Sequence, residues 1–220
     1  MNRLLAHFFS WLGNPLFLLT YLVLYLLWVN PNAFGLLDVQ SKQSYVLIAT
    51  VFVTTCLLPG LGILLLKPLG FVKHFDLRDK QERTGPYIIT AVFYLWLFKN
   101  VEDRGIFPHI FGVLVLGATL GLFFDFFFNI FFKISAHATG MGGIVAALGV
   151  ITLEWPQFGG GLSMFGGTVV LSPVFLLALS VLLAGLVGTA RLALRAHTPY
   201  ELWRGYLAGF TGVLLANMIL

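Results

Sequence analysis

Long apolar runs separated by short polar breaks dominate this chain. Several runs approach 20 residues, the length at which a helix crosses the ~30 Å hydrocarbon core of a bilayer. Hydrophobic residues make up 59% of the 220 positions and charged residues 10%, and the mean hydropathy is +0.93. Soluble domains carry about a quarter charged residues. The composition therefore predicts an integral membrane protein.

The apolar runs predict helices rather than a transmembrane β-barrel, because they are continuous and lack the alternation of barrel strands. The predicted fold class is all-α: a polytopic transmembrane helical bundle of six to seven spans, forming one domain over residues 1–220. The predicted spans are Phe8–Val29, Tyr45–Leu66, Pro86–Phe98, Ile106–Phe132, Ala138–Leu153, Val169–Ala190 and Tyr200–Leu220.

Two of these segments have alternative interpretations. The N-terminal run resembles a signal peptide, but it is long and lacks a small-x-small cleavage site, so we expect a retained first span. The segment Pro86–Phe98 has only about 13 residues, and a re-entrant or interfacial segment is its alternative. If this segment and the next both cross, the polar breaks around Arg83, Ser135 and Arg191 share one side of the membrane.

Charge and cysteine content limit the partners. The formal net charge of +4 is modest, and basic residues at membrane edges are expected without nucleic acid. Cys56 is the only cysteine, which excludes an intrachain disulfide and a thiolate metal cluster. The glycine-rich stretch from Gln157 to Gly167 lacks the Lys-Ser/Thr pair of a phosphate loop, and we expect a flexible connector there. We predict no cofactor, and a multi-pass location in a bacterial inner (cell) membrane.

Three polar breaks contain the residue types that phosphate chemistry requires. Near the C-terminus, Arg191, His197 and Glu201 follow the spacing Arg-x5-His-x3-Glu. The segments Lys133–His137 and Lys80–Pro86 form the other two breaks. Metal-free cleavage of a phosphomonoester needs cations and N–H donors around the phosphoryl oxygens, an in-line nucleophile and an acid for the leaving oxygen.

The breaks offer a candidate for each of these roles. Arg83 and Arg191 can make bidentate contacts to phosphoryl oxygens, for which the guanidinium geometry is suited. Ser135 precedes a predicted helix, so its hydroxyl and the free N–H groups of the helix start can cradle an anion. His137 and His197 would then divide the nucleophile and acid roles. The chain has no obvious two-metal carboxylate cluster, and no metal is predicted.

The order and spacing of these motifs resemble the type 2 phosphatidic acid phosphatase superfamily. Its signature is Lys-x6-Arg-Pro, then Pro-Ser-Gly-His, then Ser-Arg-x5-His-x3-Asp. The matching segments here are Ile134–His137 and Ala190–Glu201, with Arg83 for the first motif, and the resemblance runs from about Asp76 to the C-terminus. The resemblance implies a membrane enzyme that hydrolyses the terminal phosphate of a lipid phosphate or diphosphate through a phosphohistidine, without metal.

The resemblance also implies a role for each motif residue. His197 would be the nucleophile, Glu201 would replace the family's Asp as the carboxylate that orients it, and His137 would protonate the leaving oxygen. The implied phosphate ligands are Arg83, Ser135 and Arg191, with Lys80 or Arg78 as a substitute for the family's lysine.

Several positions depart from the family pattern. Asp76 stands where the first motif has Lys, and Thr84 follows Arg83 where the family has Pro. Ala136 and Ala190 replace the glycine and serine of the other two motifs. These departures keep open the alternative of a catalytically weak member that binds lipid phosphate headgroups. A membrane transporter that uses Asp125 and the arginines along a pathway is a further alternative.

Two acidic residues have structural interpretations. Thr198–Glu201 has the pattern of a helix N-terminal capping box, so Glu201 either caps the last helix alone or also orients His197. Asp125 lies inside an apolar run, where an ionised carboxylate is costly. We expect Asp125 to hydrogen-bond within the bundle rather than to relay protons.

Overall fold

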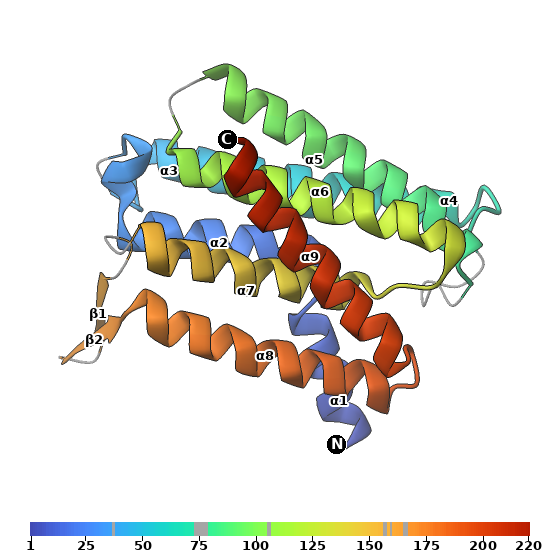
Figure 1. Cartoon of the computed structure of the whole chain (residues 1–220). Coiled ribbons are helices and arrows are strands. Elements are labelled where there is room, and N and C mark those ends of the chain that lie inside the picture. The colour runs from blue at the N-terminus through green and yellow to red at the C-terminus, as the bar shows by residue number, and fades with distance from the viewer. Residues whose placement is uncertain (37, 73–78, 105–106, 156–157, 159, 165–166) are drawn as a thin grey trace.

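The computed structural model describes residues 1–36, 38–72, 79–104, 107–155, 158, 160–164 and 167–220. Over these residues the chain is helical apart from one two-stranded hairpin. Long helices lie side by side, and the C-terminal helix crosses two of them obliquely (Figure 1). The all-α class predicted from the apolar runs describes this architecture, with the hairpin as the one addition.

The first predicted span is two helices. Helix α1 (Arg3–Leu12) and helix α2 (Pro15–Val29) are bent by 60° at a short break. The side chain of Asn14 accepts a hydrogen bond from Leu16 N, and Pro15 occupies the first turn of α2, so a new helix starts here. An N-cap followed by proline therefore interrupts the apolar run of the predicted span Phe8–Val29, and the bent pair is a candidate for one broken span.

The second apolar run forms a continuous helical segment with a wider turn in its middle. Helix α3 (Lys42–Phe52) passes into a π-helical turn, η2 (Val53–Leu57), and then into α4 (Leu58–Leu66). Pro59 has no amide hydrogen to donate to the turn before it, which favours the local change of hydrogen-bond pattern. The short 3₁₀ segments η1 (Pro31–Phe34) and η3 (Gln81–Arg83) lie in the connections on either side.

The remaining long helices are α5 (Thr84–Arg104), α6 (His109–Phe131), α7 (Ala136–Glu154), α8 (Pro173–Ala193) and α9 (Pro199–Ile219). Helix α5 has 21 residues, so the third segment is longer than the predicted Pro86–Phe98. The apolar core lies between α2, α3, α5, α6 and α7, and α9 packs on α6 and α7.

A hairpin connects α7 to α8 in place of the expected flexible connector. Strand β1 (Gly160–Met164) pairs antiparallel with β2 (Gly167–Leu171), with Gly160 opposite Leu171. The second strand contains consecutive β-branched residues, which favour extended backbone. Helix α8 consequently begins at Pro173, after the N-cap Ser172, rather than at Val169.

Four segments are long and apolar enough to cross a membrane: Lys42–Leu66 and the helices α6, α7 and α8. The bent pair α1 and α2 makes a fifth candidate if the two form one span. Among the described residues, the same criteria do not include α5 and α9, each of 21 residues. The structure therefore supports four to five membrane spans and does not confirm six or seven.

Glycines bring α9 into close contact with α7. A Cβ atom on Gly209 would lie 1.8 Å from the carbonyl oxygen of Thr139, and one on Gly142 would lie 2.3 Å from the carbonyl oxygen of Tyr206. Neither position accepts a larger residue without separating the two helices. Small residues at helix contacts are typical of membrane bundles, where close packing rather than the hydrophobic effect holds helices together.

We predict that Gly209→Ala destabilises the fold, whereas Gly149→Ala does not. The first substitution forces α9 away from α7 and should cost about 1–3 kcal/mol or more. No atom lies within 4 Å of a Cβ on Gly149, which is also on α7, so alanine there should be neutral or stabilising through its helix propensity. Thermal unfolding in detergent measures both, and equal midpoints for the two variants would contradict this account of the contact.

Candidate functional site

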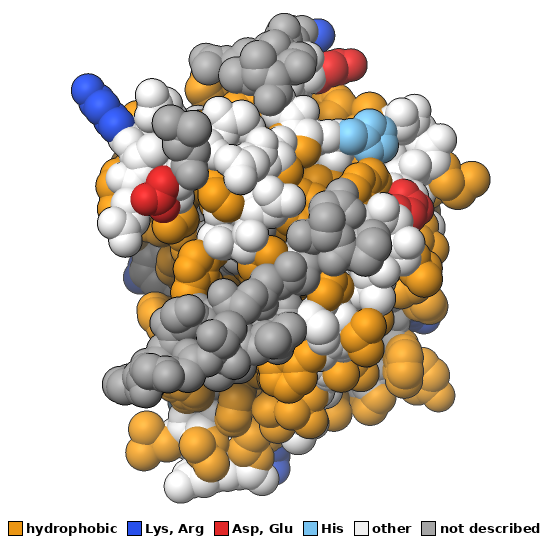
Figure 2. Space-filling view, turned by 90° about the vertical axis from the view of Figure 1, so that its left-hand side faces the viewer, with side chains coloured by type: hydrophobic (Ala, Val, Ile, Leu, Met, Phe, Trp, Pro, Cys, Tyr) orange, Lys and Arg blue, Asp and Glu red, His pale blue; other side chains and the backbone are white. Residues whose placement is uncertain are grey.

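The three polar breaks meet at one end of the bundle. This end holds the C-termini of α6 and α8 and the N-termini of α5, α7 and α9 (Figure 1). Figure 2 faces the other end, where the hairpin lies, and the charged side chains visible there are scattered among hydrophobic ones. Hydrogen bonds connect the three breaks to one another and to α1, so the breaks form one polar cluster.

His197 and Glu201 form a hydrogen-bonded pair in this cluster. Nδ1 of His197 lies 2.7 Å from Oε2 of Glu201, and the imidazole is buried. Because the carboxylate can only accept, Nδ1 carries the hydrogen, and Nε2 keeps a lone pair. His197 immediately precedes Thr198, the N-cap of α9 (Pro199–Ile219), and Glu201 lies in the first turn of that helix, so the chain reversal at the helix start brings the two side chains together.

Glu201 also completes the capping box predicted for α9. Its Oε2 accepts from Thr198 N at 3.4 Å, and Glu201 N donates to Thr198 Oγ1 at 3.4 Å. One carboxylate oxygen therefore serves both the backbone of Thr198 and the imidazole of His197. The two interpretations of Glu201 from the sequence are compatible, because the helix start holds the carboxylate in the position from which it contacts the histidine.

Two cationic side chains attach the second polar break to the others. Arg83 is buried, and its Nη1 donates to the carbonyl oxygen of Ile134 at 2.6 Å. Nζ of Lys133 donates to the carbonyl oxygen of Ala196 at 2.9 Å and lies 4.0 Å from Oε2 of Glu201. These contacts bring η3 and the loop before α9 to the start of α7.

Arg191 and His137 both contact one residue of α1. Nη1 of Arg191 donates to the hydroxyl of Ser10 at 2.8 Å, and Nε2 of His137 lies 3.1 Å from the carbonyl oxygen of Ser10. Since a carbonyl only accepts, Nε2 of His137 is the donor in this contact. Ser10 is buried and comes from the interrupted first segment, so α1 forms one wall of the cluster.

Ser135 caps the helix that carries His137. Its hydroxyl accepts a hydrogen bond from Ala138 N at 3.4 Å, and the residue is fully buried. The first-turn N–H groups of α7 point out of this helix start toward the polar cluster. A Cβ on Gly205 of α9 would lie 2.7 Å from the Ser135 carbonyl oxygen, so this glycine sets how closely the two helix starts approach.

Lys80 lies at a different place from the other candidates. The lysine is exposed, and its Nζ donates to the carbonyl oxygen of Ile130 at 3.1 Å, while Asn129 Nδ2 donates to the Lys80 carbonyl oxygen at 2.7 Å. These bonds fasten the loop before η3 to the end of α6. Lys133 is the lysine whose charge acts on His197.

The charges around His197 keep its imidazole neutral. Burial, followed by the cationic groups of Arg83, Arg191 and Lys133, lowers the pKa of His197 well below its ordinary value of 6.5. The Glu201 carboxylate acts in the opposite direction, but one carboxylate faces three cations. Protonation would place a further positive charge in a buried cationic cluster, so His197 is neutral at physiological pH and its Nε2 can act as a nucleophile.

Asp125 supports the cluster from inside the bundle. Its Oδ1 accepts a hydrogen bond of 2.6 Å from the hydroxyl of Thr139, which also lies 3.2 Å from the carbonyl oxygen of Ser135. The expectation that Asp125 hydrogen-bonds within the bundle is confirmed. Because Thr139 is one turn beyond Ser135 on α7, this contact joins the start of α7 to α6.

Sequence reasoning missed two residues of the cluster, Ser10 and Lys133. Ser10 carries no motif, and only a contact between segments far apart in the chain reveals it. Lys133 was visible as the basic residue of the second break, two positions before Ser135, but its role there was not assigned.

Asp76 and Arg78, considered for the first motif, lie outside the described residues. In the part of the chain that the structure describes, no three or more His, Cys, Asp and Glu side chains are grouped to hold a metal ion. Comparisons with protein-family models, with curated proteins and with solved structures gave no match.

We predict that His197 stays neutral through the physiological range. Lowering the pH should leave its imidazole resonances unchanged between about pH 8 and pH 5, because the pKa is lowered and the neutral form persists as protons are added. NMR of isotope-labelled histidines in detergent measures this, with His197→Ala to assign the signals. An inflection at or above pH 6.5 would show that Glu201 outweighs the cations.

Proposed function

We propose that the chain is a membrane lipid-phosphate phosphatase that uses His197 as its nucleophile. The observation that carries the proposal is the buried imidazole of His197, held through Nδ1 by Glu201 in one polar cluster with Arg83, Arg191 and Lys133. A neutral nucleophile among cations is suited to a phosphate group, whose negative charges the cations attract.

The cationic side chains would bind the phosphoryl oxygens. Arg83 and Arg191 offer planar guanidinium groups for bidentate contacts, and Lys133 offers an ammonium group. The helix start at Ser135 adds N–H donors. Arg191 already donates to the hydroxyl oxygen of Ser10, and a phosphoryl oxygen would make the same type of contact. Lys80, which contacts the end of α6, is not part of this proposal.

The first chemical step would form a phosphohistidine. Nε2 of His197 attacks phosphorus and the bond from phosphorus to the leaving oxygen breaks. The leaving oxygen takes a proton from His137 in its imidazolium form, which becomes the neutral imidazole. Glu201 accepts the Nδ1 hydrogen and favours the positive charge that develops on the imidazole. In the second step His137 removes a proton from water, which attacks phosphorus and releases inorganic phosphate and free His197.

The substrate would be a lipid phosphate or diphosphate at the membrane edge. The polar cluster lies at one end of helices that are long and apolar enough to cross a bilayer, so a phosphate bound there can keep its lipid anchor in the apolar layer. A bacterial inner membrane is the proposed location. The alanines that replace motif residues, Ala136 and Ala190, remove potential phosphate contacts, and Lys133 offers a cation that compensates.

His197→Ala should lower phosphate release from purified protein by at least about 10³-fold, because the variant has no nucleophile. Release of inorganic phosphate from phosphatidic acid and from a polyprenyl diphosphate in detergent measures the effect. His7→Ala is the matched control, because His7 is an exposed histidine on α1. Turnover that survives His197→Ala undiminished would rule out the mechanism.

Chelation should leave the reaction intact. In the proposed route the cationic side chains neutralise the phosphate, and the nucleophile is an imidazole rather than a metal-bound water. We expect the same rate of phosphate release before and after treatment with EDTA. A strict requirement for Mg²⁺, restored by adding the ion back, would indicate a different route of phosphoryl transfer.

A further inference from the structure

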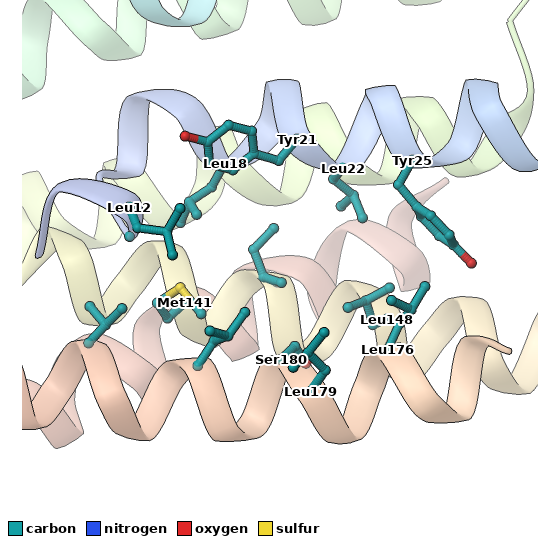
Figure 3. A pocket seen from close by; sticks show the side chains of 14 residues that line it. Leu12, Leu18, Tyr21, Leu22, Tyr25, Met141, Leu148, Leu176, Leu179 and Ser180 are labelled. Carbon is teal, nitrogen blue, oxygen red and sulfur yellow. The ribbon is translucent and has the colours of Figure 1, made fainter. Parts of the chain in front are cut away.

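An apolar cavity lies between α2, α7 and α8, with α1 at one end. Its volume is about 240 Å³, and Figure 3 shows the side chains that line it projecting from these helices toward one another. Leucine dominates the lining, with Met141 and Ile144 from α7, Val187 from α8, and Tyr21 and Tyr25 from α2. Ser180 of α8 also lines the cavity, and its hydroxyl donates to the carbonyl oxygen of Leu177.

The lining of α7 continues the helix face that carries His137. Met141, Ile144 and Leu148 follow His137 at intervals of four, three and four residues, the spacing of one face of an α-helix. With a rise of about 1.5 Å per residue, this face runs about 16 Å from the histidine to its last lining residue.

The lining of α8 continues the face that carries Arg191. Val187 and Leu183 precede Arg191 at intervals of four residues. Ser180 and Leu176 lie further toward the N-terminus on the same face. The distance from Arg191 to the last of these is about 22 Å along the helix. The two groups proposed to contact phosphate and the leaving oxygen therefore stand at one end of the same cavity.

Both ends of the cavity are defined by contacts. At the polar end, Ser10 contacts His137 and Arg191, and Leu12, two residues later, already lines the cavity. At the other end, the hydroxyl of Tyr25 donates to the carbonyl oxygen of Phe158. The cavity thus leads from a polar, cationic end into an apolar part, called the slot below, which is lined by residues of α2, α7 and α8. The hydrogen bond between Tyr25 and Phe158 lies at its far end.

We propose that this slot holds the hydrocarbon chain of the lipid whose phosphate binds at His197. The inference rests on the proposed function and specifies its substrate: a phosphate ester or diphosphate with at least one chain that reaches about 16–22 Å from His137 and Arg191 to the far end of the slot. A helix is about 10–12 Å wide with its side chains and does not fit a cavity of this volume, whereas an extended chain does.

The apolar lining would supply the affinity for the chain. The cationic side chains of the polar cluster would fix its position along the slot by binding the phosphate. Each buried methylene adds to binding. None of the described residues that line the slot is charged, which favours a hydrocarbon over a polar chain. A membrane lipid without a terminal phosphate would fill the same slot through its chain alone. The dependence of binding on the phosphate end therefore distinguishes a substrate site from a general lipid site.

An alkyl phosphonate with a diazirine at the far end of its chain tests the inference. The phosphorus–carbon bond is not hydrolysed, so labelling reports binding independently of turnover. After photolysis of the full-length protein in detergent, mass spectrometry should place the label on peptides containing Tyr25, Leu148 or Leu176. Excess phosphatidic acid should suppress this labelling about tenfold, and the same amount of phosphatidylcholine should not.

Labelling at other surfaces, or equal competition by both lipids, would overturn the inference. If the protein releases phosphate but the label lies elsewhere, this inference fails and the proposed function stands. If the slot is labelled with the expected competition and no phosphate is released, the proposed function fails and the binding site stands.

A pair of variants on α8 provides a matched control. Leu183→Trp fills the slot and should reduce slot labelling about tenfold. Leu182→Trp adds the same side chain at an exposed position next to it, 61% exposed, and should leave the labelling unchanged. Equal labelling of both variants would show that the chain lies outside the slot.

Discussion

The close contact between α7 and α9 is the constraint on which the polar cluster depends. Gly209 and Gly142 let backbone meet backbone, and Gly205 brings the start of α9 to the carbonyl oxygen of Ser135. Histidines near the starts of two helices that are far apart in the chain thereby enter one site. Between membrane helices, such packing stands in for the hydrophobic effect, which is weak because lipid is as apolar as the side chains.

The electrostatics of the cluster follow from this packing. Burial and three cationic side chains keep His197 neutral, while Glu201, fixed by its capping box, holds the imidazole through Nδ1. A glutamate that was not fixed by a capping box would supply the same negative charge but would not hold the imidazole of His197 in one orientation. A structural feature of the last helix, its N-terminal cap, therefore also determines which nitrogen of His197 is available.

The same helices separate polar from apolar binding surfaces. On α7 and α8, one face begins with His137 or Arg191 and continues into the slot, so in our proposal the phosphate and its chain would lie along one direction. The break between α1 and α2 makes this arrangement possible, because α1 turns by 60° and carries Ser10 onto both residues. A straight first span would point Ser10 away along the axis of α2.

The sequence by itself determined the features that depend on near neighbours: the membrane-helical class, the capping box at Thr198 and the candidate phosphate-chemistry residues. It left open whether Glu201 also contacts His197, which the structure shows. Tertiary structure decided which lysine lies beside His197, the place of Ser10, the break in the first segment and the slot between α2, α7 and α8. The physical reason is range. Periodicity and capping act over about four residues, whereas these features come from contacts between helices and from where a short break redirects the chain, neither of which the local pattern of residues specifies.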